Sequence, residues 1–380
     1  MSQIPFADIR AWMFDAALPF WGSAGVDHVH GGFHEALNLD GSPAESSFKR
    51  TRVICRQVYA FSHAALLGWA EGDALAKRGF DYLSEKAFLG FDQGWARRLT
   101  REGALLDPTP DLYDIAFAAF ALAWRYRQSH DGEALNLLHS TFDFVDFYMR
   151  APGGMGFVHE NPPQGPRLQN PHMHLLEASI AAYDASKDQR FLGFAEEIAD
   201  LFKRKFFDGK TLAEYFTPDL KRLDGEQGRI VEPGHQLEWA WILAQFQRIS
   251  GTNMVKEAEA LVAFAEAHGV DQASHVTFDE VRDDGAPLRK SSRTWPNTER
   301  IKGHLALFEL TGADPRPAVA GSARLLLDRY LAVTPRGGWI DQFDADGKPL
   351  SANMPTSTFY HVFLAFAEIL RLQPKLEALA

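Results

Sequence analysis

The sequence lacks the material from which several common sites and signals are built. It contains one cysteine, Cys55, so no disulfide can form within the chain and a metal site built from several thiolates is excluded. Such cysteine usage is typical of a reducing compartment. No apolar stretch approaches the roughly 20 residues of a membrane span, and the N-terminal residues show no signal-peptide pattern. We therefore expect a soluble, cytoplasmic protein that does not contact a membrane.

Motifs for nucleic acids, nucleotides and metals are also missing. The formal net charge is −11 and basic residues form no cluster, which argues against nucleic acid as a partner. No GxGxxG precedes a predicted strand and no Walker sequence occurs, so nucleotide use is unsupported. His172 and His174 would point to different faces of a helix, and no HExxH accompanies them. We expect neither a cofactor nor a metal ion.

What the sequence has in abundance is helical periodicity. Apolar residues recur at helical spacing along most of the chain. This pattern predicts twelve helices, near residues 5–18, 50–69, 73–87, 111–127, 131–149, 171–186, 189–206, 234–250, 253–268, 293–311, 315–332 and 355–373. Short and long linkers alternate between them, which groups the helices into six pairs.

The long linkers resemble one another. Those at residues 31–43, 153–160, 276–287 and 337–349 each show an aromatic residue followed by alternation, and several contain Asp-Gly, which predicts short β-hairpins. A unit of hairpin, helix, turn and helix thus recurs about every 60 residues. We predict an all-α protein in which residues 1–380 form one domain, a closed ring of six helix pairs. An open superhelix is the alternative, but the ends of the chain lack distinct polar capping units.

Polar and aromatic residues begin every second predicted helix and recur with the repeat. Separations of 57, 61, 61, 60 and 66 residues join Arg56, Tyr113, His174, His235, Trp295 and His361. In a closed ring, equivalent ends of the inner helices meet at one mouth, so we expect these residues to line a single cup. Asn170, Glu238 and Glu299 begin the same helices and are expected there too.

Each of these residues also has a plain structural explanation. A single histidine in an amphipathic helix is more often a packed or surface group than a catalyst. Trp295 suits core packing, and Glu238 and Glu299 suit a first helical turn, where acids stabilise the dipole. The shared register of His235 and His361 favours a functional role. Histidine acid–base chemistry near neutral pH, with aromatic and hydrogen-bonding neighbours, indicates a sugar substrate.

Five stretches, taken in order, resemble the N-acylglucosamine 2-epimerase superfamily. They are RQVYAFS from Arg56, NPHMHLLEA from Asn170, PGHQLEWAW from Pro233, WPNTE from Trp295 and STFYH from Ser357. The resemblance covers nearly the whole chain. The superfamily includes mannose isomerases, cellobiose 2-epimerases and N-acylglucosamine 2-epimerases, and its fold is an (α/α)6 barrel, which agrees with the predicted ring.

The resemblance implies a role for each candidate residue. His361 is expected to remove the proton next to the sugar carbonyl, and His235 to act as the second acid–base group. Arg56 and His174 are expected to hold the oxygens on which negative charge develops, and Glu238 to orient His235 as well as bind substrate. Further substrate contacts are expected from Tyr113, Asn170, Trp295 and Glu299. Such a mechanism needs no metal ion and no nicotinamide.

Within the superfamily, the sequence is most similar to the mannose isomerase branch. Cellobiose epimerases tend to carry extra tryptophans in the stretches where this chain has Thr294, Pro296 and Thr356. We therefore expect an aldose–ketose isomerase of the mannose and fructose type, active as a monomer or homodimer, with a sugar 2-epimerase as the alternative. A sugar phosphate is conceivable, because several arginines, Arg52 and Arg97 among them, can approach the cup.

Two readings outside this chemistry stay open at the level of sequence. A glycoside hydrolase on the same barrel would need paired carboxylates, which Asp111, Asp114 and Glu238 could supply. A helical scaffold without catalysis is also possible, but it would leave the repeated polar residues without a purpose.

Overall fold

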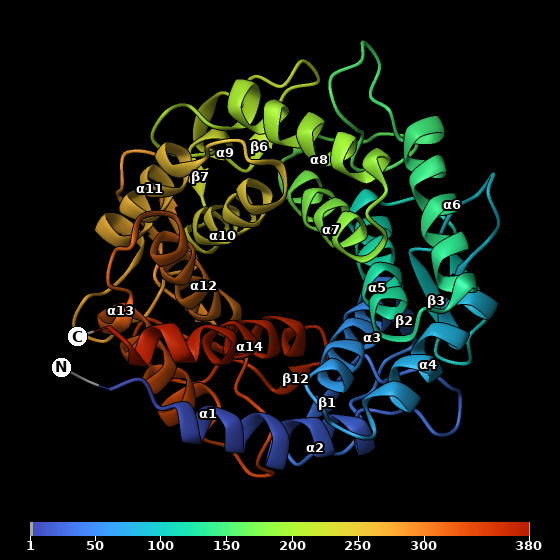
Figure 1. Ribbon diagram of the computed structural model, residues 1–380, viewed down its shortest axis with the longest axis horizontal. Helices are drawn as coiled ribbons and strands as arrows, with labels where there is room; N and C mark the ends of the chain where they lie inside the picture. Colours follow the sequence, from blue (N-terminus) through green and yellow to red (C-terminus); the bar gives the residue numbers. More distant parts are fainter. Residues whose placement is uncertain (1–2, 380) are drawn as a thin grey trace.

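The computed structural model describes residues 3–379, and their helices form two concentric rings (Figure 1). The inner ring consists of α3 (Thr51–Leu66), α5 (Leu112–Ser129), α7 (Asn170–Ser186), α10 (Pro233–Ser250), α12 (Thr294–Thr311) and α14 (Thr358–Glu377). Consecutive inner helices contact one another, and α14 contacts α3, so the ring is closed. Among the described residues, no helix is both long and apolar enough to cross a membrane.

The outer ring covers the inner one. Its members are α1 (Phe6–Trp12) with α2 (Leu18–Ser23), α4 (Gly72–Tyr82), α6 (Gly132–Tyr148), α8 (Gln189–Leu201), α11 (Val255–Phe264) and α13 (Arg316–Leu325). Most of them contain or continue into a π-helical turn, at Met13–Ala17, Leu83–Ala87, Phe202–Phe206, Ala265–Gly269 and Leu326–Tyr330. All twelve predicted helices are thus confirmed. The first extends further than predicted, to Ser23, the last starts at Thr358, and a short α9 (Gly225–Gly228) was not predicted.

The inner helices are apolar because they are covered on several sides. In α5, every residue from Ile115 to Ala123 is buried, as expected for a helix enclosed by neighbours.

Several inner helices end in a residue of left-handed conformation, which turns the chain into the next outer helix. Gly251 after α10 and Gly312 after α12, with φ of 75° and 81°, are examples. The short links therefore lie at one end of the ring and the long loops at the other.

The long loops are joined to one another by short antiparallel strands. The pairs are β1 (Ala36–Asn38) with β12 (Asn353–Pro355), β2 (Phe48–Arg50) with β3 (Arg98–Thr100), β5 (Arg167–Leu168) with β6 (Tyr215–Phe216), β7 (Ile230–Val231) with β8 (Glu280–Arg282), and β10 (Ser292–Arg293) with β11 (Gln342–Phe343). A bridge between Asp111 and Glu160 supplies the remaining link. Each long loop is therefore held to the next around the whole mouth.

This pairing changes the predicted hairpins. The hairpin in residues 276–287 is confirmed as β8 with β9 (Pro287–Arg289), and a second one joins β3 to β4 (Leu105–Asp107). In residues 31–43 and 337–349 the expected hairpin is reduced to one bridge each. In residues 153–160 no bridge joins the two halves of the described segment, but an antiparallel bridge joins Arg150 to Phe157, so the chain reverses slightly earlier than predicted. Backbone groups there pair with neighbouring segments instead.

Aromatic packing closes the ring where the two ends of the chain meet. The ring of Trp21 on α2 stacks on Trp339 with a centroid separation of 4.5 Å, and its Nε1–H donates to the carbonyl of Gly337 at 3.0 Å. Gly337 has a φ of 102°, and a Cβ there would lie 2.8 Å from a carbonyl oxygen of the first helical segment. Glycine is required at this contact for both reasons.

Candidate active site

A cavity of about 340 Å³ lies at the N-terminal ends of the inner helices. Eight of the nine predicted site residues line it, namely Arg56, Tyr113, Asn170, His174, Glu238, His235, Trp295 and His361. The long loops add further residues, including Glu232, Arg293 and Asp341. Eight residues that were selected mainly by the repeat spacing therefore lie around one cavity, as expected.

Glu299 is the ninth predicted residue, and it lies beneath the cavity rather than in its lining. Its side chain is fully buried, and its Oε1 lies 2.8 Å from Nδ1 of His361. Its Oε2 forms an ion pair of 2.6 Å with Nζ of Lys302, which is also fully buried. Glu299 thus contacts a candidate catalytic histidine instead of a substrate.

Lys302 is a buried cation that the sequence reasoning missed. Its Nζ lies 3.7 Å from Oε1 of Glu238 and 4.6 Å from the centroid of the Trp241 ring. Burial opposes the charge of Lys302, but Glu299 and Glu238 outweigh it and raise the pKa of this lysine. The only available sequence signal was its position three residues after Glu299, on the same face of α12.

The spacing of ligand atoms around Lys302 also resembles a metal site. Atoms of Glu238, Glu299 and His361 lie within 4.8 Å of one another, as do atoms of a second group formed by Glu214, Glu232 and His235. In the first group, the ammonium of Lys302 already supplies a positive charge between the two carboxylates.

His361 is held in the form of a neutral base. Burial lowers the pKa of His361 well below its ordinary value, and the cationic Arg56 and Lys302 lower it further. Burial and Glu238 raise the pKa of Glu299, while Lys302 opposes this rise. We assign the shared proton to Nδ1 of His361, with Glu299 accepting, because Lys302 favours the ionised carboxylate. Within residues 3–379 nothing hydrogen-bonds to Nε2, which is therefore left with a lone pair.

His235 is held by a different carboxylate from the one expected. Its Nδ1 lies 2.9 Å from Oε2 of Glu214, whereas no hydrogen bond joins it to Glu238, so the predicted orienting role of Glu238 is wrong. Gln169 donates to the same Glu214 oxygen at 2.8 Å and accepts from Nε1 of Trp239 at 2.5 Å. Glu214 lies in the loop just before β6, outside every motif, and no sequence signal pointed to it.

The surroundings of His235 favour its charged form. Burial opposes the charge, but Glu214, Glu232 and Glu238 outweigh it and raise the pKa of His235 to about 9. At neutral pH the cavity therefore contains the protonated His235 beside the neutral His361. The ring of Trp295 lies near both, with centroid distances of 5.1 Å to His235 and 5.6 Å to His361.

Arg56 brings an uncompensated positive charge to the cavity. Its Nη2 donates to the hydroxyl of Tyr113 at 2.7 Å, and its Nη1 donates to the carbonyl of Ser357 at 3.3 Å. The guanidinium lies 4.2 Å from the ring centroid of Phe117 and 5.1 Å from that of Tyr360. None of the described carboxylates lies within ion-pair distance of it. Such a group can stabilise negative charge on a bound ligand.

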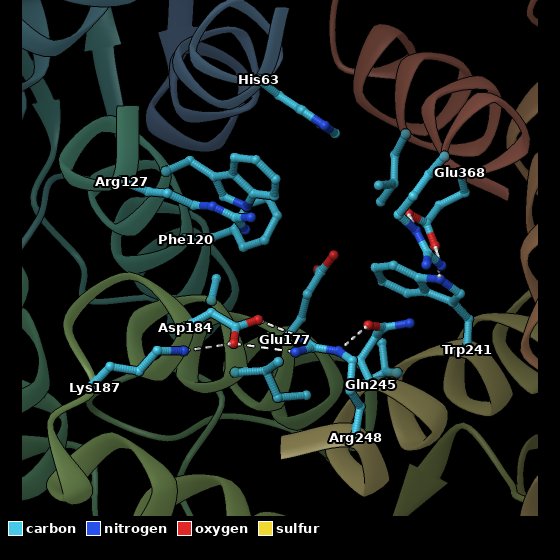
Figure 2. Close-up of a pocket in the computed structure, with 16 residues that line it drawn as sticks. His63, Phe120, Arg127, Glu177, Asp184, Lys187, Trp241, Gln245, Arg248 and Glu368 are labelled. Atoms are coloured by element: carbon cyan, nitrogen blue, oxygen red, sulfur yellow. Dashed lines mark hydrogen bonds and ion pairs between the residues drawn. The ribbon is translucent and has the colours of Figure 1, made fainter. Parts of the chain in front are cut away.

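His174 is tied to a carboxylate that also faces a second cavity. Its Nδ1 lies 3.1 Å from Oε2 of Glu177, whose Oε1 accepts from the hydroxyl of Tyr360 at 2.5 Å. Burial lowers the pKa of His174 to about 3, so the ring is neutral. Glu177 also lines a cavity of about 390 Å³ formed by the C-terminal halves of the inner helices. Figure 2 shows Glu177 and His63 pointing into that space from opposite sides.

His172 has a structural role. Its Nε2 accepts from the backbone N–H of Phe157 at 3.0 Å, and its Nδ1 lies 3.0 Å from the carbonyl oxygen of Leu168. Both ring nitrogens are used to fix the loop before α7, so His172 does not share a site with His174.

The carboxylates considered for a glycosidase are mostly engaged in the fold. Asp111 caps α5 by accepting from the N–H groups of Tyr113 and Asp114, and it pairs with Arg97 at 2.8 Å. Asp114 is fully buried and accepts from the backbone N–H of Arg52 at 2.9 Å. Glu238 alone of the three lines the 340 Å³ cavity, so the carboxylates considered from sequence do not form a pair there.

Comparisons with known proteins show which sequences and structures the chain resembles. The model of the N-acylglucosamine 2-epimerase family matches residues 31–365. Mannose-6-phosphate isomerase of Rhizobium meliloti is 34% identical over 375 residues, which cover 95% of this chain and 96% of the relative. Cellobiose 2-epimerase of Bacteroides fragilis is 24% identical over 371 residues, which cover 91% of this chain and 93% of that relative. A solved D-mannose isomerase superposes with a TM-score of 0.86 at 21% identity, covering 96% of this chain and 98% of that structure.

Proposed function

The chain belongs to the N-acylglucosamine 2-epimerase family and is an enzyme that acts on sugars, and we propose that it is an (α/α)6-barrel isomerase that interconverts an aldose and a ketose of the mannose and fructose type. One observation carries this proposal. The cavity combines a neutral histidine, a protonated histidine and an unpaired arginine. Two titratable groups with oppositely shifted pKa values are the usual arrangement of a catalytic base and acid.

The proposed reaction moves two protons. Nε2 of His361 removes the proton from C2 of the open-chain aldose, and negative charge develops on O1 of the resulting enediolate. Arg56 stabilises this charge, and the protonated His235 donates its proton to O1 and recovers one from the O2 hydroxyl. His361 then returns its proton to C1, which gives the ketose. A positioned base of this kind typically contributes about 10²–10⁴-fold, and the arginine adds electrostatic stabilisation.

Two features favour isomerisation over epimerisation. The relative that is 34% identical is a mannose-6-phosphate isomerase. In addition, Trp295 is the only tryptophan among the described residues that line the catalytic cavity. Thr356, at a position where cellobiose epimerases tend to carry a tryptophan, is buried and donates to the carbonyl of His34 at 2.7 Å. The described lining of this cavity therefore lacks the second tryptophan that cellobiose epimerases tend to carry at this position.

Epimerisation at C2 is the second candidate, and the similarity to a cellobiose 2-epimerase along 91% of the chain favours it. It shares the first step, but the proton returns to the opposite face of C2 instead of to C1. His235 is the group that would have to deliver this proton.

Incubation with mannose or fructose in heavy water separates the candidates. An isomerase forms fructose from mannose and incorporates deuterium at C1 of the ketose, whereas an epimerase forms the C2 epimer with deuterium at C2 and no ketose. His361→Asn should slow exchange by about 10²–10⁴-fold. His304→Asn is the matched control, because His304 lies outside the cavity lining and contacts Glu266. The proposal fails if the wild-type protein shows neither interconversion nor exchange with any sugar tested, phosphorylated ones included.

A further inference from the structure

Another cavity, distinct from the one that Glu177 lines, adjoins the catalytic cavity at the mouth of the ring. It has a volume of about 360 Å³, and we call it the Arg52 cavity. It shares Arg50, Arg56, Tyr113, Asn170 and Ser357 with the catalytic cavity. Because their walls are shared, a ligand whose reacting carbons lie near His361 can extend into the Arg52 cavity with its other end.

The positive charge of this cavity resides on Arg56, which also lines the catalytic cavity and is proposed above to stabilise the enediolate, and on Arg52, which lines this one of the two. Arg50 is neutralised by Glu35, with which it forms a close ion pair. Arg52 has a weaker partner, since its Nη1 lies 3.7 Å from Oδ2 of Asp114. Burial raises the pKa of Asp114 to about 7, so near neutral pH this carboxyl group neutralises Arg52 only in part. The buried Nε of Arg52 has no hydrogen-bond partner among the described residues.

The rest of the lining adds donors and little negative charge. Nδ1 of His159 is buried and has no partner in the described part of the chain. Asp111 is the only carboxylate in the lining, as far as residues 3–379 are concerned, and it is held by Arg97 and by the start of α5. Asn170 places the first turn of α7 at the cavity wall, and helix N-termini favour anions. The cavity thus has an excess of positive charge and directional donors.

We propose, on the basis of the isomerase function proposed above, that the Arg52 cavity binds the phosphate of a sugar phosphorylated at the end remote from the reacting carbons, with Arg52 as its main ligand. A phosphate monoester carries a charge of about −1.5 to −2 at neutral pH and offers three acceptor oxygens. A guanidinium binds such a group through two parallel hydrogen bonds, which a neutral hydroxymethyl group cannot match. The substrate class is therefore an aldose 6-phosphate and its ketose, rather than a free hexose or a disaccharide.

The test compares kcat/KM for mannose 6-phosphate with kcat/KM for mannose. We expect the wild-type protein to prefer the phosphorylated sugar by more than about tenfold, because hydrogen bonds between charged groups are worth at least this much. Arg52→Gln should reduce the ratio of the two values by about tenfold or more, mainly through KM of the phosphorylated sugar. Arg98→Gln is the matched control, since Arg98 pairs with Asp107 at 3.0 Å and lines neither cavity. It should leave the ratio unchanged.

Arg52→Lys provides a second variant in case the glutamine variant is unstable. It keeps the charge but not the planar pair of donors, so its ratio should lie between those of the wild type and Arg52→Gln. Inorganic phosphate should inhibit the wild type competitively and Arg52→Gln less strongly. The proposal is overturned if mannose is used as efficiently as mannose 6-phosphate, or if Arg52→Gln and Arg98→Gln change the ratio equally. In both cases sugar turnover continues and the isomerase function stands, whereas loss of turnover with every sugar would refute that function instead.

Discussion

Replacing Glu214 by glutamine tests whether a carboxylate keeps His235 protonated. The substitution preserves size and removes one charge at 2.9 Å from Nδ1 of the ring. Burial alone would lower the pKa of His235, but Glu214, Glu232 and Glu238 raise it from 6.5 to about 9. Among the described carboxylates only Glu214 hydrogen-bonds to the ring. We therefore assign it about one to two pKa units, which correspond to roughly 1.4–2.7 kcal/mol.

The direction of the effect follows from the role of an acid. A protonated group acts below its pKa and is lost as the pH rises through that value, so Glu214→Gln should move the alkaline fall of kcat/KM to lower pH. If the pKa of His235 falls from about 9 to about 7.5, the protonated fraction at about pH 8 falls from roughly 90% to roughly 25%. The difference between variant and wild type should be smallest near pH 6, where His235 is charged in both.

The assay is a profile of kcat/KM against pH for the wild type and two variants. Glu196→Gln serves as the control, because Glu196 is exposed on α8 and the substitution changes the net charge equally. Its alkaline fall should coincide with that of the wild type. An alkaline fall at the same pH in Glu214→Gln would show that the charge of His235 does not depend on Glu214. A shift of the acidic limb alone would refute the assignment of His235 as the acid.

Three further substitutions have expected outcomes. His361→Asn should lower kcat by about 10²–10⁴-fold without a change in melting temperature, as measured by steady-state kinetics and thermal unfolding. Lys302→Met leaves two buried carboxylates without their cation and should lower the free energy of unfolding by about 3–5 kcal/mol in a urea titration. Unchanged stability would mean that the ion pairs of Lys302 with Glu238 and Glu299 do not stabilise the fold. Gly337→Ala forces a side chain onto a φ of 102° and should cost about 1–3 kcal/mol by the same titration, whereas Gly132→Ala, which has open space, should not destabilise the protein.

The repeat made two features predictable from sequence, namely the inner helices and the residues that lie together at their N-terminal ends. Periodicity identifies each helix, and a spacing close to the repeat length places residues at equivalent heights around the ring. Arg56 and His361 are far apart in sequence, yet both line the catalytic cavity because each lies one turn inside an inner helix. The strand pairs between loops were harder to predict, since segments of two or three residues carry almost no pattern of their own.

The partners of the histidines could not be predicted in the same way. Glu214 reaches His235 from a loop 21 residues earlier, and Glu299 reaches His361 from α12, 62 residues earlier. Both contacts depend on how neighbouring units pack, and no local pattern encodes that packing. The family resemblance implied that Glu238 orients His235, but the structure places Glu238 beside Lys302.

The difference in protonation between His235 and His361 arises from the charged side chains around each ring. His235 and His361 occupy equivalent positions on inner helices and are almost equally buried, at 6% exposed each, so burial alone would make both rings neutral. Three carboxylates around His235 reverse that effect, while Lys302 and Arg56 reinforce it at His361. The repeat therefore places His235 and His361 at one cavity, and in the mechanism proposed above the charges that are not repeated make His235 the acid and His361 the base. It follows that exchanging these buried charges, rather than the histidines, is the change that should alter which group removes the proton from the sugar.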